Sequence, residues 1–183
     1  MFQLGFGMDA FRSGLLTLAV FAGNLSMKLV TTRVMRRFGF RSVLLLNGAF
    51  AALTLAAMSL LSAATPYRVT VAVLFVSGLA RSLQFTAINT LSFADVPKPQ
   101  MSGASTLAST LTQMSMGMGV ALGAIALRAA GWLHGHPAQA VTTADFSLAF
   151  VLVAAVGALA LLDVFTLDPR AGAHVTGHTQ PTK

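Results

Sequence analysis

The chain has 183 residues, of which 55% are hydrophobic and only 9% are charged, and its formal net charge is +7. An ordinary soluble domain carries about 25% charged residues, so this composition excludes a water-soluble globule and indicates a protein of the lipid bilayer. Cysteine is absent, which excludes disulfides and thiolate chemistry, and basic residues that flank apolar segments are explained by membrane topology rather than by nucleic-acid binding.

The chain begins with a short amphipathic lead-in, residues 1–13. This segment lacks the basic start, the apolar stretch and the small-residue cleavage site of a secretory signal. We therefore expect no cleaved leader within it.

Five long apolar segments follow the lead-in. Each approaches the roughly 20 helical residues that cross a hydrocarbon core about 30 Å thick. They cover residues 14–30, 42–64, 69–93, 103–127 and 146–167. A β-barrel is excluded, because its segments alternate over about 10 residues instead of running continuously. The sequence thus predicts an all-α integral membrane protein, a polytopic bundle of about five transmembrane helices.

The distribution of Lys and Arg predicts the orientation of this bundle. Residues 31–41, after the first span, form the most basic segment, so we expect a cytoplasmic loop there. Alternation then places 65–68 and 128–145 outside, and 94–100 inside. The tail, 168–183, is rich in Gly, Thr, Pro and His, and we expect it to be cytoplasmic and disordered.

Polar side chains share one helix face in three of the spans, whereas the second and fifth spans are nearly apolar. The residues that matter most for function are Arg81, Gln84 and Asn89 in the third span and Thr106, Thr110 and Gln113 in the fourth. Two interpretations stay open: such side chains bond to a neighbouring helix, which is worth about 0.6 kcal/mol each, or they line a polar pathway.

Arg81 is the most informative single residue. Arginine near the bilayer centre costs roughly 2.5–3.5 kcal/mol on insertion scales, so Arg81 needs a partner or water. No Asp or Glu lies at a similar depth in this sequence. Its partner is therefore a carbonyl or polar side chain of this chain, an anionic substrate, or an acid on another part of the protein.

Other motifs indicate packing or no chemistry. Gly119 and Gly123 form a GxxxG element, which predicts helix packing. His134 and His136 lack a third ligand, so no metal site is predicted. Since no nucleophile–base constellation, carboxylate pair or phosphate loop can be assembled either, we expect neither an enzyme nor a bound cofactor.

Several stretches resemble a known family. Residues 79–91, 93–97 and 113–121 resemble the C-terminal part of the EmrB/QacA-like drug:proton antiporters of the major facilitator superfamily. The basic loop resembles the superfamily's loop signature through Arg37, Gly39 and Arg41. It departs from that signature at Arg36, Thr32 and Phe40, which replace an Asp, a Gly and an Arg.

The resemblance implies a fold and a function. The chain would be the C-terminal part of a major-facilitator fold, its last five helices preceded by the end of another helix. The function would be proton-coupled export of small amphipathic compounds across a bacterial inner membrane, with the six polar residues above lining the pathway. The partners would be the lipid bilayer, a small-molecule substrate and the missing N-terminal helices, without which the chain would not transport. The alternative is a truncated, non-transporting membrane protein that packs with another membrane protein or with itself.

Overall fold

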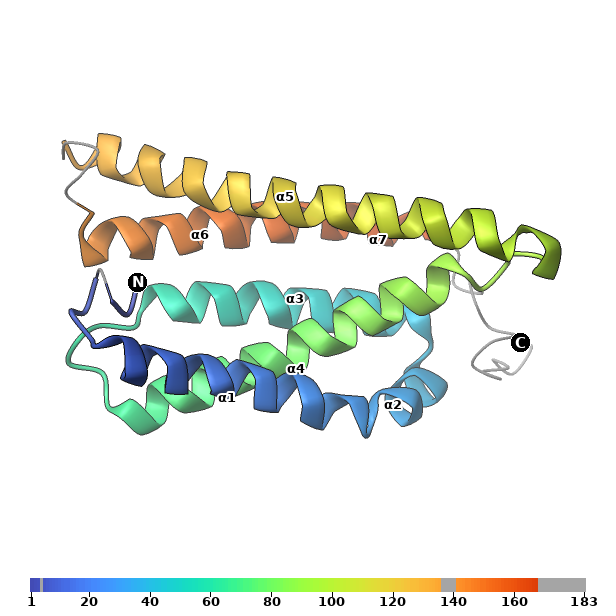
Figure 1. Ribbon diagram of the computed structural model, residues 1–183, viewed down its shortest axis with the longest axis horizontal. Helices are drawn as coiled ribbons and strands as arrows, with labels where there is room; N and C mark the ends of the chain where they lie inside the picture. Colours follow the sequence, from blue (N-terminus) through green and yellow to red (C-terminus); the bar gives the residue numbers. More distant parts are fainter. Residues whose placement is uncertain (4, 136–140, 168–183) are drawn as a thin grey trace.

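A computed structural model describes residues 1–3, 5–135 and 141–167, and Figure 1 shows that these residues form helices joined by turns. No strand occurs in these ranges, so the predicted all-α fold is confirmed. Four helices are long and apolar enough to cross a membrane, or five if a bent helix pair counts as one span. The predicted tail, 168–183, and His136 lie outside the described residues.

The helices have the following bounds. They are α1 (Ala10–Lys28), α2 (Thr31–Phe38), α3 (Phe40–Ser59), α4 (Tyr67–Ser92), the short 3-10 turn η1 (Lys98–Gln100), α5 (Met101–Leu133), α6 (Thr143–Leu159) and α7 (Leu161–Phe165). A short break separates α1 from α2, and the two helices meet there at 57°.

Several helices continue into polar segments outside the predicted apolar spans. The first helix starts at Ala10, inside the expected lead-in, because the Asp9 carboxylate caps it by accepting the Arg12 backbone N–H at 2.7 Å. Basic residues do not oppose helix formation, and the segment expected to be an open loop is instead helical over Thr31–Phe38. For the same reason α5 continues past Arg128 as far as Leu133.

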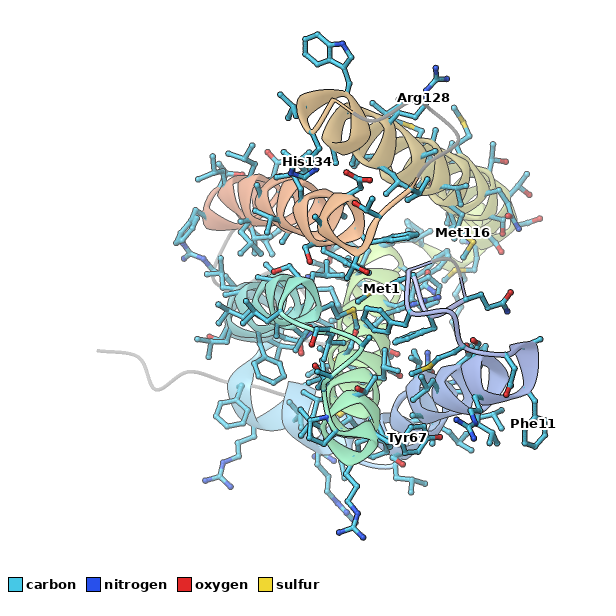
Figure 2. All side chains as sticks on the ribbon, turned by 90° about the vertical axis from the view of Figure 1, so that its left-hand side faces the viewer. Met1, Phe11, Tyr67, Met116, Arg128 and His134 are labelled. Carbon is cyan, nitrogen blue, oxygen red and sulfur yellow. The ribbon has the colours of Figure 1, made fainter. Side chains whose placement is uncertain are left out.

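The helices pack as an open row rather than as a closed bundle. Along this row α1 packs on α4, α4 on α3, α3 on α6, and α6 on α5. In the described part of the chain, α5 has no extensive contact with α1 or α4. Figure 2 shows the segment at Met1 between the α5–α6 pair and α1. The two ends of the row, α1 and α5, therefore leave uncovered faces.

A close crossing holds α1 against α4. A Cβ placed on Gly23 would collide with the backbone carbonyl of Phe75, and one placed on Gly78 would collide with that of Val20. At the same crossing the Ser82 hydroxyl donates to the Asn24 carbonyl at 2.9 Å. Small residues let two backbones approach in this way, which is a common device for packing helices in membranes.

Two buried clusters stabilise opposite ends of the molecule. At the end that carries α2, the cluster joins α1, α2, α3 and α4 through Met27, Met35, Phe40, Val43, Leu44, Leu83 and Ala87. At the other end, which we call the Met1 end, the cluster consists of Leu16, Met58, Leu61 and Leu74, with Phe2 and Phe6 packed against it. The first residues of the chain are thus part of the folded core.

Candidate functional site

The polar residues of α4 divide between two helix faces. Gln84 is half-buried and faces α3, where its Oε1 accepts a hydrogen bond from Asn47 Nδ2 at 2.9 Å. Asn47 Nδ2 also donates to the Ala80 carbonyl at 2.8 Å. This geometry corresponds to the helix-bonding interpretation of polar membrane residues. Gln84 therefore fixes α4 against α3, and a pathway role for its amide would require that contact to open.

Arg81 lies on a different face of α4 and is exposed. Within the described ranges no hydrogen bond or ion pair joins Arg81 to another residue. Phe85 and Ile88, one and two turns further along the same face, are exposed as well. The sequence left three kinds of partner open for Arg81. The first of them, a carbonyl or polar side chain of this chain, does not bind Arg81 among the described residues. Asn89, also predicted to line the pathway, is half-buried beside this face.

The polar residues of α5 lie along a helix that is covered on one side only. Thr106 and Thr110 donate their hydroxyls to carbonyls one turn earlier, those of Ser102 and Thr106, at 3.2 and 3.0 Å. Both threonines and Gln113 are exposed. Thr106 and Thr110 thus bond within α5, and in the described part of the chain no hydrogen bond joins Thr106, Thr110 or Gln113 to Arg81.

The GxxxG glycines lie on this same uncovered helix. A Cβ built on Gly119 or Gly123 meets nothing within 4 Å among the described residues. The glycines at which two helix backbones approach closely are instead Gly23 and Gly78. The packing role predicted for Gly119 and Gly123 therefore requires a partner beyond the described chain.

The basic residues singled out in the loop signature surround the α2–α3 junction. Gly39 ends α2 and precedes α3 with φ 73° and ψ 163°, a conformation that only glycine adopts readily. Arg37 places its guanidinium 5.8 Å from the centre of the Phe38 ring. Arg41 donates from Nη2 to the Phe165 carbonyl at 3.0 Å, and a cation is favourable at such a helix C-terminus. This junction thus connects α3 to the end of α7.

A polar cluster at the Met1 end was not anticipated from the sequence. Asp145 is 1% exposed, and its carboxylate lies 2.7 Å from His134 Nδ1. It also accepts the Thr142 backbone N–H at 2.8 Å and the Thr142 hydroxyl at 2.9 Å. The signal was present in the sequence: a Thr followed three residues later by an acid before an apolar run is a capping box. The cluster joins the end of α5 to the start of α6.

Among the described residues, no group of three His, Cys, Asp or Glu side chains could hold a metal ion. The arrangement places the Arg81 guanidinium near the middle of α4 and hydroxyl and amide groups along one face of α5. Such groups suit contacts with polar molecules.

Comparisons with known proteins agree on one family. The sequence model of the Major Facilitator Superfamily matches residues 1–182. A candidate multidrug resistance protein, MdtD, of Klebsiella pneumoniae is 34% identical over 91% of this chain and 35% of its own length. The MdtD of Escherichia coli O6:H1 is 32% identical over 86% of this chain and 33% of its own length. The chain thus spans about a third of the length of these curated relatives, and no solved structure matches it.

Proposed function

Because the chain belongs to the major facilitator superfamily, a family of membrane transporters, we propose that it forms the C-terminal bundle of a secondary active exporter. Its cargo would be small amphipathic compounds, moved in exchange for protons across a bacterial inner membrane. The observation that carries this proposal is the similarity to bacterial proteins named for multidrug resistance over nearly the whole chain. The C-terminus of the bundle would be cytoplasmic, as the basic residues around α2 indicate.

The pathway would run along the uncovered faces of α4 and α5. The residues proposed to line it are Arg81, Gln84, Asn89, Thr106, Thr110 and Gln113. Exposure of Arg81, Thr106, Thr110 and Gln113 supports this role, because these side chains have room to meet a substrate or water. Gln84 would contribute by holding α4 in place through Asn47.

The chain alone would not transport. Alternating access requires two bundles that rock against each other around a midplane site, and the described residues supply at most five spans in an open row. The missing N-terminal helices would cover that row. Proton coupling would likewise depend on acids outside this chain.

A dye-efflux experiment tests the proposal. The chain alone and the longest reading frame that contains it are each expressed in a bacterium that lacks its main drug exporters, and ethidium accumulation is measured with and without a protonophore. We expect lower accumulation only with the longer frame, and loss of that effect with the protonophore. Efflux by the 183 residues alone would refute the requirement for further helices. No efflux by either form would favour the alternative, a non-transporting membrane protein.

A further inference from the structure

We propose that α2 and the residues next to it bind the headgroups of anionic phospholipids in the cytoplasmic leaflet. This headgroup surface consists of Lys28, Leu29, Val30, Arg33, Arg37 and Phe38. The inference goes beyond the proposed function, because it concerns the lipids around the protein and not the compound that is carried. It rests on the proposed function in one respect only, the cytoplasmic placement of α2.

Side-chain charge is divided unevenly between the two ends of the described molecule. The Met1 end has three basic residues and two acids, and the end that carries α2 has six basic residues and two acids. Those at the α2 end are Lys28, Arg33, Arg36, Arg37, Arg41 and Lys98, with Asp95 and Asp163. The sequence contains no acid between Asp9 and Asp95, so α1, α2 and α3 bring only positive charge to this end. An anionic surface complements it.

The arginines of α2 lie on the side of the helix opposite to its packed side. Thr31 and Met35 are buried, and Met35 belongs to the apolar cluster at this end. At about 100° per residue, Arg33 and Arg37 each lie about 160° around the helix from Met35, and both are exposed. Membrane topology requires only that these arginines stay on the cytoplasmic side. The structure shows in addition that they point away from the protein core.

The bend between α1 and α2 keeps these arginines close to the membrane surface. With 19 residues α1 is about 28 Å long, close to the thickness of the hydrocarbon core. The eight residues of α2 span about 12 Å and make 57° with α1, so α2 advances only about 6 Å along the direction of α1. The headgroup layer on each side of a bilayer is about 5–8 Å thick. If α1 crosses the membrane, α2 at its end therefore lies at headgroup depth (Figure 1).

Apolar side chains are exposed among the basic ones. Leu29 is 82% exposed and Phe38 is 51% exposed. The Arg37 guanidinium lies 5.8 Å from the centre of the Phe38 ring. Apolar side chains favour the acyl chains, whereas Lys and Arg favour the phosphate groups just above them. A lipid boundary therefore suits this surface better than a soluble anion, which would leave Leu29 and Phe38 in water.

Lipid-dependent thermal unfolding of the full-length protein, purified in detergent, tests the proposal. We expect phosphatidylglycerol to raise the melting temperature more than phosphatidylcholine does. The difference should shrink when salt is raised from about 0.15 M to about 1 M, because the Debye length falls from about 8 Å to about 3 Å. The variant Arg33→Gln/Arg37→Gln should need roughly 25-fold more phosphatidylglycerol for the same shift, about fivefold for each cation removed.

The matched control is Arg12→Gln/Arg68→Gln, which removes two exposed arginines from the Met1 end. We expect this control to keep the response of the wild type. Each variant is compared with itself in phosphatidylcholine, so a change in its intrinsic stability does not alter the comparison. A wild type without a preference for phosphatidylglycerol, or an equal loss of that preference in both double variants, would overturn the proposal.

A photocrosslinking experiment identifies the occupant and leaves every arginine in place. The change Phe38→benzoylphenylalanine is made in the full-length protein, which is irradiated in bacterial membranes, and its adducts are identified by mass spectrometry. Tyr67→benzoylphenylalanine is the control, because Tyr67 is 49% exposed at the Met1 end. We expect phospholipid adducts at position 38, with phosphatidylglycerol enriched over the control. Adducts with another segment of the polypeptide, no phospholipid adduct or no enrichment would each contradict the proposal.

These outcomes separate the inference from the proposed function. Ethidium efflux by a protein that shows no lipid preference would overturn the inference alone. A preference for phosphatidylglycerol at α2 in a protein that exports nothing would uphold the inference and overturn the function.

Discussion

Replacement of Asp145 by Ala is the sharpest test of how the α5–α6 hairpin is held together. The carboxylate is buried, and it accepts three hydrogen bonds at 2.7–2.9 Å from His134 and Thr142. The substitution removes all three at once. It also leaves the Thr142 backbone N–H without its capping acceptor.

The expected cost follows from the three bonds. Loss of a helix cap costs about 1 kcal/mol, and a hydrogen bond to a charged group contributes about 1.5–3 kcal/mol. Part of this is recovered, because the His134 side chain is 36% exposed and can bond to water instead. We therefore expect a loss of about 2–4 kcal/mol, or about 4–16 °C in melting temperature for a chain of this size.

The assay is thermal unfolding of the purified protein in detergent. Asp163→Ala is the control, because Asp163 is exposed in α7 and its carboxylate makes no hydrogen bond to a described residue. A melting temperature for Asp145→Ala equal to that of the control would refute the reasoning, since it would mean that the buried carboxylate contributes nothing to the hairpin.

Two glycine substitutions test the packing and the backbone of the other helices. Gly78→Ala should destabilise the protein by about 1–3 kcal/mol, because its methyl group would meet the Val20 carbonyl at the α1–α4 crossing. In contrast, Gly117→Ala on the open face of α5 should stabilise the protein by up to about 1 kcal/mol, because alanine has the higher helix propensity. Equal shifts in melting temperature for the two variants would contradict the close approach of α1 and α4 at Gly78. Gly39→Ala should cost about 1–3 kcal/mol, because it forces a side chain into a glycine conformation. Gly14→Ala, at an open helical position, is its control, and a Gly39→Ala variant as stable as this control would argue against the strained junction.

Most of the fold could be predicted because hydrophobic length is a strong local signal. The apolar segments between residues 42 and 167 all lie on helices of the structure, apart from their ends and short breaks. The helix prediction was wrong where charged residues interrupt an apolar segment although the helix continues through them. Residues 31–38 were expected to be a loop because of Arg33, Arg36 and Arg37, yet they form α2.

The contacts between helices were harder to predict than the helices themselves. A GxxxG pattern is visible within one segment, which is why Gly119 and Gly123 were singled out. Gly23 and Gly78 instead each lie against the backbone of a helix that is distant in sequence. Arg81 and Gln84 were likewise grouped on one face, because residues three apart lie only about 60° from each other around a helix. That spacing does not show that Gln84 lies at the edge of the face, where it meets a neighbouring helix. Only the structure shows that Gln84 contacts α3 while Arg81 remains exposed.

The pairing of α1 with α4 has a consequence for how the chain enters the membrane. During synthesis, Gly78 follows Gly23 by about 55 residues, which corresponds to about 3–11 s at 5–20 residues per second. Over that interval the first helix is in the bilayer without the neighbour against which it finally packs. Its small-residue face must then be shielded by lipid, by the insertion machinery or by a helix made earlier, and the order of assembly differs from the order of translation.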